Sequence, residues 1–423
     1  MTSRERVQRV MEHKEADRVP LDLGGSTVTG MHVDTVYNLR QALHLDQPGP
    51  PVKVIEPCQM LGEIKLDLME ALGVDVARLA APKAKFGFKN ADWKPWTTFG
   101  GVPALVPGGF NTQPEPNGDI LMYPEGDKSV APSGRMPKGG FYFDAIVRQP
   151  PIDENNLRVE DNIEEFGPIS DADLEHLRTE AERLYTQTDK AILANFGGMG
   201  FGDIANVPGV GLKNPKGIRD IEEWYISTVT RRDHIYKIFE RQCEIAISNL
   251  EKIFAVVGNR VTAFYSTGTD FGQQNGPFIS PKTYRDLYKP FNQEINNWVH
   301  KKTQWKCFIH SCGSIRALLP DFIDAGFEII NPVQCSAAGM APEELKKEFG
   351  DRVTFWGGGV DTQQTLPFGT PEEVRREVCT RLKIFGQSGG YVFNTTHNVQ
   401  ARVPVENVLA LYQAVRECGK YPL

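Results

Sequence analysis

The chain has 423 residues, of which 40% are hydrophobic and 24% are charged, and its formal net charge is -7. This is the balance of an ordinary globular protein, and a net negative chain without long runs of Lys or Arg argues against nucleic acid as a partner. No apolar run approaches the 18 residues that indicate a membrane span.

The cysteines and the first residues both point to a cytoplasmic protein. Seven cysteines are scattered along the chain, and an odd, dispersed set does not predict a disulfide framework. Residues Met1–Arg6 are charged and lack the apolar stretch of a signal peptide.

Strand-like segments alternate with helical segments along the chain, a pattern that predicts an α/β fold with a parallel sheet. The predicted strands are Val19–Gly24, Val74–Ala80, Ala191–Gly197, Val261–Ser266, Trp305–His310, Glu328–Val333, Val353–Gly357 and Tyr391–Thr395. Eight such strands are the number that a TIM-type barrel needs. We therefore predict a single (β/α)8 barrel domain over residues 1–423.

Two features refine this prediction. Ser280-Pro281 and Thr370-Pro371 each place a capping residue before a first-turn proline, which predicts a helix start, and the segment Ile218–Val257 is long enough for two helices. Residues 85–151 are rich in Gly, Pro and aromatic residues and show no helical period. We predict that they form a β-rich excursion after the second strand, as a lid, an oligomer contact or a substrate-gripping element.

Polar residues gather where the later predicted strands end, and in barrels the chemistry takes place at those ends. The residues in question are Asp270 and Gln273 after the fourth strand, His310 and Cys312 at the fifth, Asn331 and Gln334 at the sixth, Asp361 after the seventh, and Asn394 and His397 at the eighth. We predict an active site among them.

His310, Cys312 and His397 suit a zinc ion, because imidazole and thiolate are good zinc ligands and a barrel brings the strand ends to one rim. Water, Gln334 or substrate would take the fourth position. The alternative for His310 and Cys312 is a packed histidine beside a buried cysteine.

The remaining polar residues have two interpretations each. Asp270 is a general acid or substrate anchor, or else it caps its loop, and Asp361 either contacts substrate or caps a turn. We predict catalytic roles for Asp270, His310 and His397. The predicted substrate-binding residues are Gln273, Asn331, Gln334, Asp361 and Asn394.

Several motifs of the chain resemble the uroporphyrinogen decarboxylase superfamily, in its corrinoid-dependent methyltransferase branch. They are Asp17-Arg18-Val19-Pro20, His310-Ser311-Cys312-Gly313-Ser314, Asn331-Pro332-Val333-Gln334, Gly357-Gly358-Gly359-Val360-Asp361 and Val403-Pro404-Val405-Glu406-Asn407-Val408. The family's decarboxylases carry an early Met-Arg-Gln-Ala-Gly-Arg motif, which this chain lacks. His397 occupies the position where the coenzyme M-type members have a cysteine ligand.

The resemblance implies a methyltransferase of the EC 2.1.1 type in anaerobic one-carbon metabolism. It would move a methyl group from a small methylated donor, such as a methoxylated aromatic ether, to Co(I) cobalamin on a separate corrinoid-binding protein. This O-demethylase would use zinc, and a homodimer is left open.

Three other functions compete with this one. A methylcobamide:thiol methyltransferase would share the zinc site. A decarboxylase should use cationic anchors, and the strand ends considered above carry few Arg or Lys. A scaffold protein would not need polar residues concentrated at these ends.

Overall fold

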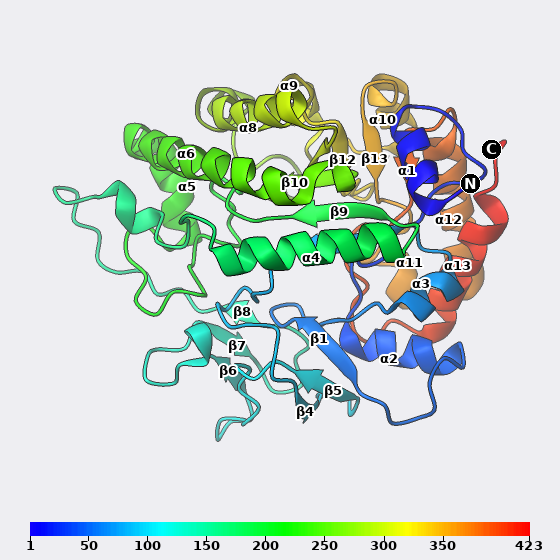
Figure 1. Ribbon diagram of the computed structural model, residues 1–423, viewed down its shortest axis with the longest axis horizontal. Coiled ribbons are helices and arrows are strands. Elements are labelled where there is room, and N and C mark those ends of the chain that lie inside the picture. The colour runs from blue at the N-terminus through cyan, green and yellow to red at the C-terminus, as the bar shows by residue number, and fades with distance from the viewer.

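A computed structural model describes residues 1–423 and has a curved sheet of seven parallel strands at its centre (Figure 1). The strand order is β14-β13-β12-β11-β10-β9-β3. These strands are β3 (Val76–Ala80), β9 (Ala191–Asn195), β10 (Ala263–Thr267), β11 (Lys306–His310), β12 (Ile329–Asn331), β13 (Thr354–Trp356) and β14 (Tyr391–Val392). They match seven of the eight predicted strands, with shorter bounds.

The segment predicted as the first strand lies between the two edges of this sheet. Leu21 forms a parallel bridge with Phe393, just after β14. On the other edge the amide of Asp75, just before β3, donates to the carbonyl of Leu21 at 2.7 Å. The arrangement is consistent with a TIM-type barrel. This segment forms a single bridge at Leu21 and not a continuous strand.

Helices surround the sheet, as Figure 1 shows for α4, α6, α8 and α9. The α-helices are α1 (Ser3–Met11), α2 (Val33–Ala42), α3 (Leu66–Leu72), α4 (Asp171–Gln187), α5 (Ile221–Thr230), α6 (Arg232–Val257), α7 (Pro281–Thr283), α8 (Lys289–Lys302), α9 (Leu319–Asp324), α10 (Pro342–Phe349), α11 (Thr365–Phe368), α12 (Pro371–Gly386) and α13 (Val405–Cys418). A π-helical turn, Tyr284–Tyr288, joins α7 to α8, and short 3-10 turns lie at Pro124–Gly126, Val159–Asn162, Gly258–Arg260 and Arg316–Leu318.

The predicted helix starts are confirmed. Thr370 caps α12 in a capping box with Glu373, and Ser280 accepts a hydrogen bond from the amide of Thr283 at the start of α7. The segment Ile218–Val257 holds two helices, α5 and α6, as predicted. None of the helices has the length and the apolar composition to cross a membrane.

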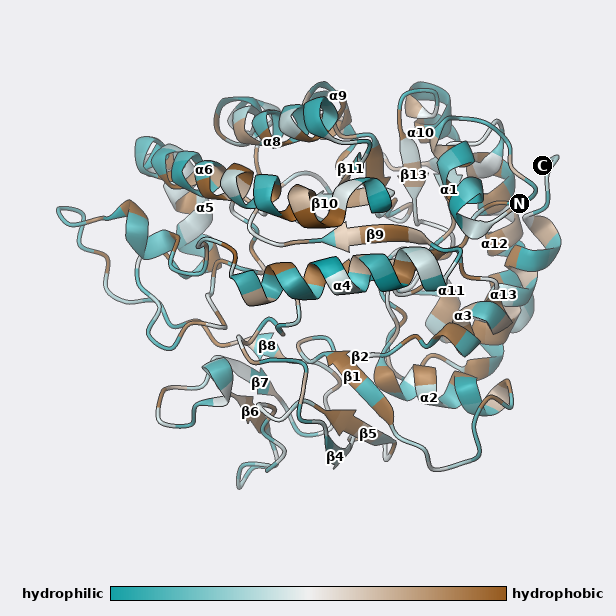
Figure 2. Cartoon of the chain, viewed as in Figure 1, coloured by the Kyte–Doolittle hydropathy of each residue, from teal (hydrophilic) through white to brown (hydrophobic).

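Two hydrophobic layers hold the barrel together, and the apolar strands lie inside more polar helices in Figure 2. The larger one contains 88 buried residues, which lie between the central sheet and the helices and extend into the smaller sheets beside the barrel. The smaller layer fills the inside of the barrel with alternate strand residues, because side chains alternate between the two faces of a strand. Its members from the strands are Val76, Ala191, Leu193, Ala263, Tyr265, Phe308, Ile329, Trp356 and Val392.

Helix α1 closes the amino end of the barrel. Val7 and Val10 of this helix belong to the inner layer and are fully buried. The carbonyl of Val10 accepts a hydrogen bond from the amide of Gly390, directly before β14. The amino end of the barrel is therefore filled by side chains, and the free space lies at the carboxyl ends of the strands.

Two small sheets lie beside the barrel, below α4 in the view of Figure 1. One has the order β2-β1-β5-β4 and the other β6-β7-β8. Their strands are β1 (Val52–Glu56), β2 (Leu61–Gly62), β4 (Lys94–Thr97), β5 (Pro103–Val106), β6 (Ile120–Met122), β7 (Gly134–Met136) and β8 (Asp144–Ala145). Because β1 and β2 precede β3, the first sheet is not confined to residues 85–151, and an excursion with these bounds stays a prediction.

A disulfide joins Cys379 of α12 to Cys418 of α13. The scattered cysteines did not predict this bond, because 39 residues separate the partners along the chain. The packing of the two helices brings their Cα atoms to 5.4 Å, within the usual range for a disulfide. The other five cysteines are free.

An ion-pair cluster surrounds Asp75 at the amino end of β3. Its fully buried carboxylate accepts hydrogen bonds from Arg6 at 2.7 Å, from Arg18 at 2.7 and 2.9 Å, and from the amide of Leu21 at 2.8 Å. Arg6 also pairs with Asp17 at 2.6 Å, and this hydrogen bond lowers the pKa of Asp17 to about 2. The Asp17-Arg18-Val19-Pro20 motif thus anchors the first segment of the barrel.

Candidate active site

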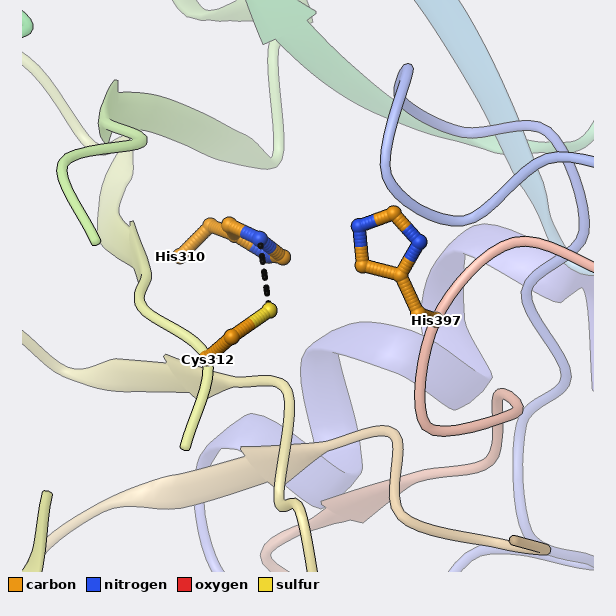
Figure 3. Close-up of side chains that lie close together, drawn as sticks. All are labelled: His310, Cys312 and His397. Carbon is orange, nitrogen blue, oxygen red and sulfur yellow. Dashed lines mark hydrogen bonds between the residues drawn. The ribbon is translucent and has the colours of Figure 1, made fainter. Parts of the chain in front are cut away.

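Three predicted zinc ligands meet at the carboxyl end of the barrel. His310 is the last residue of β11, Cys312 follows it in the next loop, and His397 comes from the loop after β14 (Figure 3). One ligand atom from each of the three lies within 4.8 Å of the others. Cys312 Sγ is 3.4 Å from His310 Nε2, and the two imidazole centroids are 5.5 Å apart.

The hydrogen bonds of Asn331 determine which nitrogen of His310 faces this cluster. The Asn331 amide Nδ2 donates to the carbonyl of Trp356 at 2.8 Å, so its Oδ1 is the atom that accepts. This oxygen lies 2.6 Å from His310 Nδ1, which must therefore carry the proton. Nε2 is left with a free lone pair directed toward Cys312, the arrangement typical of a histidine that binds a metal.

The environment keeps both histidines neutral. Burial is the main cause that lowers the pKa of His310, and burial together with the nearby His310 lowers the pKa of His397 to about 3. Burial, followed by the charge of Asp270, raises the pKa of the Cys312 thiol. In the absence of a cation the three residues are an uncharged cluster of two nitrogen donors and one sulfur donor.

The loop that carries Cys312 is fixed by two side chains. Asp270 Oδ1 accepts a hydrogen bond from the Cys312 amide at 2.7 Å, and Gln334 Oε1 accepts one from the Gly313 amide at 2.9 Å. Gly313 has a φ of +82°, and a Cβ there would lie 2.5 Å from the Gly272 carbonyl carbon. Only glycine fits this turn without displacing a neighbouring backbone.

The cluster borders a cavity of about 420 Å³ whose lining includes His310, His397 and Asp270. This volume lies in the usual range for small-molecule sites, about 300–1,000 Å³. A second cavity of about 490 Å³ lies between α4 and α6 and shares the Gly197–Met199 loop with the first. We place the active site in the first cavity, because the polar strand ends open into it.

None of the five predicted substrate-binding residues lines this cavity. Asn331 and Gln334 hold His310 and the following loop, as described. Asp361 caps its own turn by accepting from the amides of Gln363 and Gln364, which favours the capping alternative. Asn394 is buried and donates to the carbonyl of Asp22, and Gln273 is exposed. Their substrate contacts remain predictions.

The cavity is also lined by polar residues from the first half of the chain that were not predicted. They include Glu56, Arg78, Lys85, Asn195 and Asp203. Burial raises the pKa of Asp203 to about 6. A signal was present for Arg78, because it interrupts the apolar run Val76–Ala80 in a strand covered on both faces.

Comparisons with known proteins support the superfamily. Residues 216–418 match the family model described as uroporphyrinogen decarboxylase (URO-D). The uroporphyrinogen decarboxylase of Chlorobium phaeobacteroides is 28% identical over 194 residues, 43% of this chain and 51% of that protein. The enzyme of the same name from Psychromonas ingrahamii is 35% identical over 151 residues, 34% of this chain and 39% of that protein. The chain thus spans about half or less of the length of the curated relatives it matches.

A solved structure shares the fold over nearly the whole chain. It is a methyltransferase from Methanosarcina mazei, with a TM-score of 0.53, 15% sequence identity, and 99% of each chain covered. At this identity the likeness concerns the fold alone. It supports the barrel architecture, including the part of the chain that precedes the family match.

Proposed function

We propose that this protein is a methyltransferase that moves a methyl group from a small methylated donor, such as a methoxylated aromatic ether, to Co(I) cobalamin on a separate corrinoid-binding protein. The observation that carries the proposal is the cluster of His310, Cys312 and His397 beside a cavity at the mouth of the barrel. A cavity at that end can receive a small donor and remain accessible to a second protein.

The donor set fits zinc. With zinc bonds of about 2.0–2.3 Å, two ligand atoms in a tetrahedral site lie roughly 3.3–3.8 Å apart. The 3.4 Å between Cys312 Sγ and His310 Nε2 agrees with this separation, and a ligand atom of His397 lies within 4.8 Å of both. When bound, zinc would act as a Lewis acid that stabilises the oxygen from which the methyl group departs.

The chain's own residues orient this chemistry. Asn331 fixes the tautomer of His310, and Asp270 holds the backbone of Cys312. Asp270 also lines the cavity, so its carboxyl group can contact the leaving oxygen of a bound donor or deliver a proton to it. Catalysis would rest mainly on alignment of the methyl group and stabilisation of the leaving group, since Co(I) is itself a strong nucleophile.

A specific observation favours a second candidate, a decarboxylase. Such an enzyme needs cationic anchors, and Arg78 and Lys85 line the cavity. The curated relatives named above carry the name of a decarboxylase. The two candidates differ in product, because one releases carbon dioxide from an acid and the other methylates a corrinoid.

The test uses purified protein with Co(I) cobalamin and a panel of methyl donors, following the corrinoid spectrum and the demethylated product. We expect demethylation only when the reduced corrinoid is present. His310→Ala and Cys312→Ala should each lower the rate about 10²–10³-fold, as for loss of one electrostatic stabiliser. The matched control is Cys335→Ala, a partly buried cysteine outside the cluster.

Three results would contradict the proposal. They are demethylation without corrinoid, wild-type rates for both cluster variants, and release of carbon dioxide without methyl transfer. The metal is tested separately by elemental analysis of protein purified without chelators. We expect about one zinc per chain in the wild type and in Cys335→Ala, and much less in Cys312→Ala.

A further inference from the structure

Arg78 projects from β3 into the barrel. Arg78 is two residues from Val76 along the strand, so the two side chains point to the same face. Val76 belongs to the inner hydrophobic layer. In the sheet it is paired with Leu193 of β9, another member of that layer. Since Val76 fills the space nearer the amino end, Arg78 extends toward the cavity and lines it.

The guanidinium of Arg78 has no partner within the protein. It forms no ion pair, and its Nε is buried without a hydrogen bond. Burial lowers the pKa of Arg78, and Glu56 is the one acid whose charge opposes this effect. Glu56 is engaged elsewhere, because its two oxygens accept from the amides of Cys58 and Gln59 at 3.1 and 2.7 Å.

The other acids of the cavity also accept hydrogen bonds within the protein, whereas Arg78 forms none. Asp203 accepts from the Ala205 amide and from Asn206, and Asp270 accepts from the Cys312 amide. Arg78 is half-buried, with its Nε fully enclosed. A partly buried cation without a partner is unfavourable, and a ligand that supplies the counter-charge would stabilise it.

We propose that Arg78 binds a carboxylate of the substrate, so that the methyl donor is a small carboxylic acid. The part of this inference that concerns methyl transfer rests on the proposed function. The binding of a carboxylate is argued from the residues of the cavity alone. The carboxylate would lie against β3, and the methyl group would lie in the part of the cavity that His310 and His397 line.

A carboxylate fits better than a phosphate for two reasons. The planar guanidinium matches the two oxygens of a carboxylate in a bidentate pair. The cavity already contains the side chains of Glu56, Asp203 and Asp270, and a dianion would be repelled more strongly than a monoanion. Lys83 and Lys85, which line the same cavity, add further positive charge nearby.

Binding without corrinoid tests the anchor independently of methyl transfer. The probes are 4-methoxybenzoate and its neutral counterpart 4-methoxybenzamide, measured by calorimetry on the full chain. We expect the acid to bind the wild type more tightly than the amide. Arg78→Gln should weaken binding of the acid about 10–100-fold and leave the amide unchanged, because a hydrogen bond to a charged group is lost.

Thermal unfolding separates a ligand anchor from a structural residue. If Arg78 serves a ligand, Arg78→Gln removes an unpaired, half-buried charge, and the ligand-free variant should melt at the same temperature as the wild type or higher. Arg78→Lys should keep part of the affinity for the acid. The control is Arg178→Gln, an exposed arginine on α4 that pairs with Glu175, which should bind like the wild type.

The outcomes are distinguishable. Equal binding of acid and amide, unchanged binding in Arg78→Gln, or a lower melting temperature of that ligand-free variant would overturn the anchor, whatever the methyl-transfer assay shows. Tight, Arg78-dependent binding of the acid without any methyl transfer to Co(I) would uphold the anchor and reject the proposed reaction.

Discussion

Replacement of Asp75 by alanine should destabilise the fold without affecting the chemistry. The substitution removes the carboxylate that Arg6 and Arg18 share, together with the acceptor for the Leu21 amide. The side chains of Asp75 and Arg6 are 0% and 8% exposed, so water cannot take over these bonds fully. Removing one partner of a buried ion pair typically destabilises by about 3–5 kcal/mol.

This free energy converts into a modest change in melting temperature because the chain is long. A chain of 423 residues has an unfolding entropy of about 0.9 kcal/mol/K. Asp75→Ala should therefore melt roughly 3–6 °C below the wild type, measured by calorimetry at neutral pH. The activity per folded molecule should be unchanged, because Asp75 lies at the amino end of β3, opposite the site.

The matched control is Asp17→Ala. Asp17 also pairs with Arg6, but its side chain is 46% exposed, and exposed pairs contribute about 1 kcal/mol or less. It should lower the melting temperature by roughly 1 °C. If both variants melt alike, or if Asp75→Ala loses activity per folded molecule, the assignment of this cluster to barrel closure is wrong.

Three further predictions concern the site and its support. Asn331→Ala should weaken zinc binding about 10–100-fold by freeing the ring of His310, and unchanged metal affinity in a competition with a chelator would refute this. Burial raises the pKa of Asp22 to about 6, so its contribution to stability is present below about pH 4 and is lost as the pH rises to about 6. Denaturant unfolding should show this component in the wild type and not in Asp22→Asn. Gly313→Ala should displace the loop that carries Cys312 and reduce the bound metal with all ligands intact, whereas full metal content would show that the loop adapts.

Much of the barrel could be predicted from the sequence, because apolar runs and helix caps are local features. Seven predicted strands were found, and the proline-marked helix starts were confirmed. The first predicted strand forms only a bridge at Leu21, since its backbone is held largely by Asp75 and Phe393, which are distant in sequence.

The site could be predicted in part. His310, Cys312 and His397 were found because they follow strands whose ends must meet. The substrate contact of Asn331 stays a prediction, whereas its hydrogen bond to His310 could not be predicted because it depends on side-chain geometry. The role of Arg78 depends on which face of β3 points inward, and this requires the register of the whole sheet.

The closed amino end of the barrel has a consequence for kinetics. With Val7 and Val10 of α1 and the aromatic side chains of Phe308 and Trp356 filling the interior, a small molecule has no route through the bottom of the barrel. In the proposed reaction the donor and its product would both use the mouth, the same opening to which a partner protein would dock. The order of events would then be compulsory: the small molecule would enter first, the partner would cover it, and the product would leave only after the partner had dissociated. Steady-state rates should accordingly show inhibition by excess partner protein when donor is scarce.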